Sequence, residues 1–211
     1  MDAVIAALYV QRGGVYWDLP DVDAWPESRD ARKYAGPHAV VAHPPCQRWG
    51  RYWSGGPSVR VRRELGDDGG CFRAALAAVR RFGGVLEHPE ASHAWRAHGL
   101  LTPPKWGGWV NADLEGGWTT CVEQGHFGHR ARKATWLYAH GCELPSLPKG
   151  RSEASMRMDE GFHSSADRRA ARAAGHRAPP RLPDAERAAT PLPFRDLLLS
   201  MARSVDQEID R

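Results

Sequence analysis

Cys46 stands where a side chain could do chemistry. It follows an apolar run, Val40–Ala42, then His43 and the double proline Pro44-Pro45, and it precedes Gln47. The apolar run predicts a buried strand, and the two prolines make the turn after it rigid. A structural cysteine would gain nothing from such a turn, whereas a nucleophile gains a fixed direction of attack. The pattern therefore indicates a nucleophilic thiol at a strand end.

Two further strand ends carry polar groups of a matching kind. Val85-Leu86 predicts a strand that runs into Glu87, and the stretch Phe127–Arg132 joins two more apolar runs. In open α/β sheets, ligands bind at the carboxyl ends of the strands. A thiol, a carboxylate and the pair Arg130 and Arg132 at one edge suit nucleophilic attack on a nitrogen heterocycle.

The elements that must position these groups follow from the apolar pattern, which predicts an α/β domain with a largely parallel sheet. Strands are expected at residues 4–10, 39–42, 85–87, 118–124 and 135–140, and helices at residues 71–82, 92–98 and 192–205. Asp67 and Asp68 are expected to cap the first helix, and Gly83-Gly84 ends it. Residues 17–37 are rich in turn formers, and residues 50–66 predict a mobile loop.

Three regions of the chain differ in composition. Residues 1–148 are predicted to form the α/β catalytic core, residues 149–186 a short basic recognition or insert segment, and residues 187–211 a C-terminal helix that returns to the core. Arginines crowd at residues 48–63 and 151–187. This crowding favours phosphate or guanine as a partner, although a solvated basic surface gives the same pattern.

The overall composition excludes several classes of protein. The chain has 211 residues, a net charge of +4 and a mean hydropathy of −0.55, and no apolar run approaches the length that crosses a bilayer. The N-terminus lacks the basic region of a secretory signal, so we expect a cytoplasmic protein with no membrane partner. The four cysteines form no CxxC pair, so neither a disulfide framework nor a metal site is expected.

The order of these motifs resembles that of the DNA cytosine-C5 methyltransferases. In that family Pro-Cys-Gln carries the nucleophile, Glu-Asn-Val follows, and a Phe/Tyr-Gly turn leads to Arg-x-Arg, a target-recognition segment and a last helix. Here PPCQ supplies Cys46, VLEHP supplies Glu87, FGHRAR supplies Arg130 and Arg132, and ATPLPFRDLLLSMA is similar to the last helical motif. The similarity covers about residues 39–141 and the region near the C-terminus. It implies a Rossmann-like methyltransferase fold, with a mostly parallel sheet flanked by helices and truncated at its N-terminal side.

The resemblance also implies a chemistry. Cytosine C5 is a poor nucleophile, and addition of the Cys46 thiolate to C6 of a flipped cytosine makes C5 reactive. Glu87 would neutralise and orient the ring at N3, and Arg132 or Arg130 would hold the carbonyl oxygen or a flanking phosphate. Arg48 and the arginine pair are expected to lower the pKa of the thiol. The implied partner is DNA, as a duplex with a flipped base or as a single strand. The implied substrate contacts are Pro45, Gln47, Arg48, Trp49, Arg51, Tyr52 and Trp53.

The resemblance is weaker in the residues that bind the cofactor in the family. The family wraps S-adenosylmethionine with Phe-x-Gly-x-Gly, and the matching residues here are Tyr9, Gly13 and Gly14, with Thr190 and Pro191 in the last motif. The chain between these glycines and the nucleophile is short for the helix and two strands that hold the cofactor in the family. In addition, His-Pro replaces Asn-Val after the glutamate, and the Pro-Gln that usually precedes Arg-x-Arg is missing.

Three functions stay open at this point. They are a minimal DNA cytosine-C5 methyltransferase, a pyrimidine C5-modifying enzyme of a phage DNA-hypermodification pathway that does not use S-adenosylmethionine, and a non-catalytic nucleic-acid-binding relative. The motif order favours the first, and the short cofactor half favours the second. Intact Cys46 and Glu87 argue against the third. A phage-encoded or nucleoid-associated protein in a bacterial host follows by analogy. No feature of the sequence predicts the oligomeric state.

Overall fold

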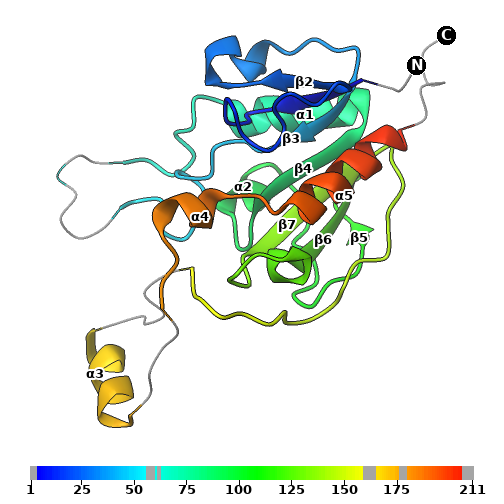
Figure 1. Cartoon of the computed structure of the whole chain (residues 1–211). Coiled ribbons are helices and arrows are strands. Elements are labelled where there is room, and N and C mark those ends of the chain that lie inside the picture. The colour runs from blue at the N-terminus through cyan, green and yellow to red at the C-terminus, as the bar shows by residue number, and fades with distance from the viewer. Residues whose placement is uncertain (1–3, 56–59, 61–62, 159–164, 176–179, 206–211) are drawn as a thin grey trace.

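A seven-stranded sheet runs through the middle of the protein, in the order β2-β1-β3-β4-β7-β6-β5 (Figure 1). The computed structural model describes residues 4–55, 60, 63–158, 165–175 and 180–205. The strands are β1 (Ile5–Leu8), β2 (Val22–Trp25), β3 (Ala39–Ala42), β4 (Gly84–Pro89), β5 (Val110–Asn111), β6 (Trp118–Glu123) and β7 (Ala134–His140). The α-helices are α1 (Cys71–Phe82), α2 (His93–Ala97), α3 (Ser165–Ala173), α4 (Asp184–Ala188) and α5 (Leu192–Arg203), and the 3-10 helices are η1 (Glu27–Arg29), η2 (Ala31–Lys33) and η3 (Gln124–Phe127).

One half of the sheet is parallel. β2, β1, β3 and β4 run side by side in the same direction, and Leu8 of β1 lies opposite Trp25 of β2 and Ala42 of β3. The chain passes from β1 outward to β2 and then returns across β1 to β3, so the strand order reverses between β1 and β3. Such a reversal leaves a crevice outside the carboxyl ends of the two strands, where ligands bind in open α/β sheets. The residues that follow Leu8 and Ala42 therefore stand at a position suited to a ligand.

The other half of the sheet is antiparallel. β7 runs antiparallel to both β4 and β6, and β5 runs antiparallel to β6. Because residues 124–133 between β6 and β7 are too few for a crossover helix, these two strands pair as a hairpin. The prediction of a mostly parallel sheet is therefore wrong, and the fold is α/β with a mixed sheet. As a consequence, residue 133 reaches the same edge as the carboxyl end of β4, where Pro89 pairs with Thr135.

Helices cover both faces of the sheet, and Figure 1 shows α5 in front of it and α1 behind it. Leu8 and Leu86 belong to the apolar core on the face of α1 and α2, whereas Ala7 and Val85 belong to the core on the face of α5. Strands buried on both faces need apolar residues in succession, which is why β1 and β3 read as continuous apolar runs. No helix in the described part of the chain is long and apolar enough to cross a bilayer.

Asp68 ties the start of α1 to the turn that carries Cys46. Its carboxylate accepts hydrogen bonds from the N–H of Phe72 and from Nε1 of Trp49, each at 2.8 Å. Trp49 is 7% exposed and its ring packs against Phe72. Asp68 thus satisfies an N–H in the first turn of α1, although Gly70 and neither of the two expected aspartates occupies the N-cap position. The same carboxylate fixes the chain just after the cysteine.

Between β1 and β3 the chain forms the strand β2 and the short helices η1 and η2. The sequence pattern misses β2 because this strand lies at the edge of the sheet and all its residues are partly exposed. Asp23 stands within it, where it accepts a hydrogen bond from Nε1 of Trp25 at 2.7 Å. The short stretch between β1 and β3 therefore forms one edge strand and two 3-10 helices.

The basic segment 149–186 is held to the core at both of its ends. Near its start, the N–H and the hydroxyl of Ser152 donate to the Glu123 carboxylate at 2.7 and 2.9 Å. Near its end, Leu182 is buried and α4 follows. Figure 1 shows α3, between these two anchors, apart from the sheet. Residues 159–164 and 176–179 of the expected recognition segment, and residues 206–211 of the expected C-terminal region, lie outside the described residues.

Replacing Asp68 should destabilise the protein measurably. Asp68→Ala leaves the N–H of Phe72 and Nε1 of the buried Trp49 without their acceptor. The expected loss is about 2–3 kcal/mol in the free energy of unfolding, measured by urea denaturation with far-UV circular dichroism. Asp67→Ala, at the exposed neighbouring position, is the control and should change stability by less than about 0.5 kcal/mol. Equal losses in the two variants would contradict the role given to Asp68.

Candidate active site

Two of the residues expected to form a site, Cys46 and Glu87, lie together at the carboxyl edge of the parallel strands. Cys46 is partly buried in the turn after β3, and Glu87 belongs to the adjacent strand β4. Burial raises the pKa of the Cys46 thiol, and the negative charge of Glu87 raises it further. The positive charge of Lys133 acts in the opposite direction on the thiol pKa. A thiol, a carboxylate and an ammonium group therefore lie within electrostatic reach of one another.

The Glu87 carboxylate is held by hydrogen bonds to both of its oxygens. Nδ1 of His43 lies 3.1 Å from Oε2, and Nε2 of Gln124 donates to Oε1 at 3.2 Å. Burial alone would raise the pKa of Glu87, but the hydrogen bond with His43 and the charges of His43 and Lys133 outweigh burial and lower the pKa to about 2. Glu87 is thus ionised at neutral pH, although its side chain is only 14% exposed.

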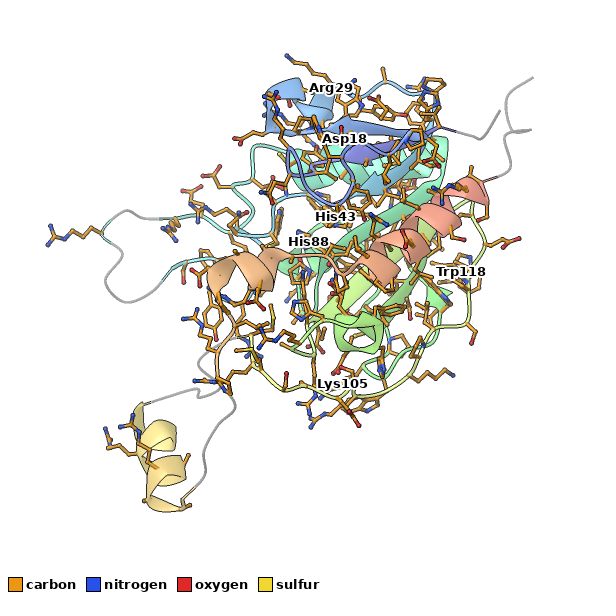
Figure 2. All side chains as sticks on the ribbon, in the orientation of Figure 1. Asp18, Arg29, His43, His88, Lys105 and Trp118 are labelled. Atoms are coloured by element: carbon orange, nitrogen blue, oxygen red, sulfur yellow. The ribbon has the colours of Figure 1, made fainter. Side chains whose placement is uncertain are left out.

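His43 links Glu87 to Tyr16. Nε2 of His43 lies 2.9 Å from the hydroxyl oxygen of Tyr16. Burial, and then the charge of Glu87, raises the pKa of Tyr16 well above its usual value, so the hydroxyl keeps its proton. A carboxylate oxygen can only accept a hydrogen bond, so His43 carries a proton on Nδ1 and donates it to Glu87. Figure 2 shows His43 in the middle of the molecule, beside the start of α5.

Gln124 connects Glu87 with the backbone of Lys133. Its Nε2 also lies 2.9 Å from Oγ1 of Thr135, and that hydroxyl donates to the carbonyl oxygen of Lys133 at 3.1 Å. Thr135 and Glu87 both accept at these contacts, so the amide of Gln124 must present its nitrogen to them. Its oxygen is left buried, with no hydrogen-bond partner within the described residues.

Lys133 is placed by an unusual backbone conformation and by the C-terminal part of the chain. Its φ of 43° lies in the left-handed region, which a lysine adopts rarely. Its Nζ donates to the carbonyl oxygens of Ala188 at 3.3 Å and Ala189 at 2.6 Å, where α4 ends. Burial lowers the pKa of Lys133, and the negative charges of Glu87 and Cys46 oppose that shift. The side chain is therefore a partly buried cation with two of its hydrogens given to the backbone.

The side chains of Arg130 and Arg132 bind partners outside the group formed by Cys46, Glu87 and Lys133. Arg130 pairs with Glu186 at 3.0 Å, and Nε of Arg132 donates to the carbonyl oxygen of Ser152 at 3.2 Å. Their side chains are 58% and 49% exposed. The positive charge that lowers the thiol pKa is that of Lys133 and not, as expected from the sequence, that of Arg48 or of the arginine pair.

Several of the expected substrate contacts lie beside a hollow in the surface. Pro45, Gln47 and Arg48 line it together with Asp67 and Asp68, and its volume is about 360 Å³. This volume falls within the range of about 300–1,000 Å³ that small-molecule sites occupy. The hollow therefore has room for part of a nucleotide next to the turn that carries Cys46.

The aromatic residues after Cys46 have different environments. Trp49 is buried and belongs to the core, whereas Tyr52 is 63% exposed and Trp53 is partly buried. Arg51 is exposed beside them. A base could thus stack on Tyr52, but the Trp49 ring is already covered by protein. Residues 56–59 and 61–62 of the expected loop lie outside the described residues.

The residues expected to hold a cofactor lie around the point where the strand order reverses. Tyr9 follows β1 with a φ of 60°, and its hydroxyl donates to a carbonyl oxygen at the start of α1. Gly13, before Gly14, has a φ of 68° and open space where a Cβ atom would stand. Thr190 and Pro191 precede α5, and an arginine in the first turn of α5 donates to a carbonyl oxygen of the loop after the glycines at 2.9 Å. The loop and the start of α5 are therefore neighbours with open space at Gly13.

His88 occupies the position where the family has asparagine, and it points away from Glu87. Its Nδ1 lies 2.7 Å from Oγ of Ser92, and its ring packs against Phe72 and Trp95. Burial lowers the pKa of His88 to about 4, so the ring is neutral at neutral pH. His88 is thus part of the core beneath the site.

Sequence reasoning missed Tyr16, His43, Gln124 and Lys133 as members of this group. Two of them had a signal. His43 directly precedes the double proline, and Lys133 directly follows Arg-x-Arg. Tyr16 and Gln124 carry no such mark, because their contacts depend on which loops meet at the sheet edge.

The described residues contain no group of three or more His, Cys, Asp or Glu side chains arranged to hold a metal ion. Comparison of the chain with family models, with curated proteins and with solved structures finds no match. Its function must therefore be argued from the site itself.

The low pKa of Glu87 predicts a pH dependence of stability. A carboxyl whose pKa is lower in the folded state stabilises the protein above its unfolded-state value of about 4.5, and this contribution disappears as the pH falls toward about 2. Wild-type protein should therefore lose on the order of 2–3 kcal/mol more than Glu87→Gln over this pH range, measured by urea denaturation at each pH. Glu143→Gln, at an exposed position, is the control. Parallel curves for wild type and Glu87→Gln would overturn the assignment.

Proposed function

We propose that this chain is a DNA cytosine-C5 methyltransferase-like enzyme that uses Cys46 to attack C6 of a flipped cytosine. The observation that carries the proposal is the Cys46 thiol beside the ionised, hydrogen-bonded carboxylate of Glu87, at the carboxyl edge of β3 and β4. A thiol nucleophile and a group that handles ring protons are what addition to a pyrimidine requires. The order of the sequence motifs supports the same reaction and a Rossmann-like methyltransferase fold.

The described side chains account for the proton that the ring needs. The Cys46 thiol gives up its proton, and the thiolate forms a bond to C6 while electrons of the C5–C6 double bond move toward N3. Glu87 is ionised at rest, so it can deliver a proton to N3 only after it has accepted one. The proton that the Cys46 thiol gives up would pass to Glu87, which would hand it on to N3, so no proton has to leave His43. C5 then attacks the electrophile and loses its proton to a base, and the thiolate leaves C6.

DNA is the proposed partner because exposed cations and an exposed aromatic ring lie close in sequence to Cys46 and Lys133. Arg51 and Tyr52, which follow Cys46 in the chain, are exposed, and Arg130 and Arg132, which precede Lys133, are about half exposed. Arginines of this kind bind phosphates, and an exposed tyrosine can stack on a base. A base drawn out of the stack would need contacts of this kind.

In the methyltransferase proposal, S-adenosylmethionine would supply the methyl group. Tyr9, Gly13 and Gly14, with Thr190 and Pro191, would hold it at the carboxyl end of β1. Gly13 is exposed, and a Cβ atom at its position would meet open space, so the turn does not obstruct a ligand there. The residues that would complete the cofactor pocket are fewer than in the family, because β2, η1 and η2 are all that the chain forms between β1 and β3.

This short stretch favours a second candidate function. A pyrimidine C5-modifying enzyme that does not use S-adenosylmethionine would keep Cys46 and Glu87 and need no complete pocket for adenosine. Such an enzyme would attach or exchange another group at C5, as in a phage DNA-hypermodification pathway. The two functions share the attack at C6 and differ in the electrophile that C5 meets.

DNA that contains 5-fluorocytosine should trap the protein. Once an electrophile has been supplied to C5, as S-adenosylmethionine or from an extract of cells that express the protein, the fluorine blocks the proton loss that releases the thiolate. A covalent adduct should then accumulate and migrate as a slower band in a denaturing gel. Peptide mapping of the adduct should find the base on Cys46. Cys46→Ser should form no adduct, whereas Cys71→Ser, the matched control at a partly exposed cysteine on α1, should trap as well as wild type. Trapping by Cys46→Ser would refute the nucleophile assignment.

Calorimetry with S-adenosylmethionine separates the two candidate functions. A methyltransferase should bind the cofactor, with DNA present or absent. Gly13→Val should weaken binding, because a valine at a φ of 68° is strained and should distort that turn. If neither titration gives heat while 5-fluorocytosine DNA is still trapped, the second function is the correct one. Mass spectrometry of nucleosides from cells that express the protein then identifies the group at C5.

A further inference from the structure

We propose that Lys105, Trp106 and Arg151 form a stacking surface for single-stranded DNA, on which the indole ring contacts an unpaired base and the two cations hold phosphates. The inference rests on the proposed function in taking DNA as the partner, and it decides between the duplex and the single strand that the sequence left open. Lys105 and Trp106 lie outside every motif from which the site was expected.

The indole ring of Trp106 is unusually exposed for a tryptophan and has two cations beside it. Trp106 is 50% exposed, whereas tryptophan is highly buried on average. Nζ of Lys105 lies 4.9 Å from the centroid of the ring, and Cζ of Arg151 lies 5.6 Å from it. Both cations are exposed, and neither pairs with a carboxylate of a described residue. An aromatic ring and two positive charges are therefore available to a partner at one place.

This combination fits a strand of unpaired nucleotides. Every base has a flat face that can stack on an indole ring, and lysine and arginine bind the phosphates on either side of the base. An acidic peptide would satisfy the cations but would leave the ring without a flat partner. In a duplex, neighbouring base pairs already cover the faces of each base, so a single strand is the better fit. The target cytosine of such a strand also reaches Cys46 without the loss of a base pair.

Backbone contacts hold the two parts of the stacking surface together. The N–H of Gly150 donates to the carbonyl oxygen of Trp106 at 3.0 Å. Gly107 has a φ of 93°, and a Cβ atom at its position would stand 3.4 Å from the side chain of Lys149. The turn that carries Trp106 is thus fastened to the stretch of chain that leads into Arg151.

The same stretch connects the stacking surface with Glu87. Ser152 follows Arg151 and is buried, and it packs so closely on Gly125 that a Cβ atom there would stand 2.1 Å from Oγ of the serine. Gly125 follows Gln124 in η3, and the side chain of Gln124 donates to Glu87 at 3.2 Å. The stacking surface therefore belongs to a segment that packs against the hydrogen-bond network of the carboxylate.

A second hollow in the surface lies along this segment, just beyond Ser152. It has a volume of about 570 Å³ and is lined by His129, Arg130, Glu153, Ala154 and Ser155. This volume is within the range of about 300–1,000 Å³ that small-molecule sites occupy, so it has room for a nucleotide. Arg130 gives one N–H to Glu186 and keeps others for a phosphate. A strand held at Trp106 would have this hollow beside it.

Fluorescence anisotropy with a labelled oligodeoxyadenylate at low salt tests the stacking surface apart from the reaction, because this strand contains only purines and Cys46 is proposed to attack a pyrimidine. Wild-type protein should bind the single strand more tightly than the same strand paired with oligodeoxythymidylate. Trp106→Leu should weaken single-strand binding by about fivefold or more and leave duplex binding unchanged. Trp106→Phe should keep most of the affinity, because a phenylalanine ring also stacks on bases.

Charge variants test the two cations in the same assay. Lys105→Gln and Arg151→Gln should each weaken binding and lower the slope of log affinity against log salt concentration by about 0.7. Arg203→Gln is the matched control, because Arg203 pairs with Asp21, and it should leave the slope unchanged.

Trp118→Leu is the control for loss of an indole ring, since Figure 2 shows Trp118 away from Lys105. It should bind the single strand as wild type does, and far-UV circular dichroism checks that each variant is folded. Undiminished single-strand binding by Trp106→Leu, or tighter binding of the duplex than of the single strand by wild type, would overturn the proposal.

The binding result and the trapping result are independent. Single-strand binding that depends on Trp106, together with no adduct on 5-fluorocytosine DNA, would keep the stacking surface and reject the attack on a pyrimidine. An adduct through Cys46, together with single-strand binding that is indifferent to Trp106, would keep the proposed function and reject this inference.

Discussion

A buried carboxylate is the constraint on which the rest of this structure depends. Glu87 lies within a strand that has neighbours on both sides, and an ionised carboxylate in such a place is stable only when donors satisfy it. His43 from the end of β3 and Gln124 from η3 supply these donors. Tyr16 holds the far side of His43, and Thr135 holds the amide of Gln124. Four separate segments are thus required to meet at one point because one charge is buried there.

The mixed sheet is what allows these segments to meet. Parallel strands bring only their carboxyl ends to an edge, which places His43 and Cys46 there but nothing from the chain after β6. The hairpin of β6 and β7 reverses the chain at the same edge, and it adds Gln124 and Lys133. Opposite charges therefore reach Cys46 from the two halves of the sheet. The electrostatic environment of the thiol is a property of this topology more than of the residues that neighbour it in sequence.

Features of the fold and the site that have local causes could be predicted from the sequence, and features that depend on distant parts of the chain could not. β3 and α1 were predicted with their observed bounds because burial on both sheet faces and on one helix face leaves a strong apolar pattern. Strand direction leaves no such pattern, since an apolar run reads the same either way. Cys46 and Glu87 could be predicted because each lies at a strand end. Lys133 could not, because a left-handed backbone and carbonyl oxygens far along the chain decide where its side chain lies.

The two sides of the point where the strand order reverses differ in how tightly their side chains are held. On the side of β3 and β4, buried hydrogen bonds fix His43 and Glu87, so a change in one side chain disturbs the others. On the side of β1, the loop has exposed Gln11 and Arg12 and open space at Gly13, so substitutions there disturb little. Under the proposed function, a chain built in this way could change the group that reaches C5 while its means of attacking C6 stays intact. The fixed side would then constrain the ring that is attacked, and the open side would be where relatives of this chain differ in the group they transfer.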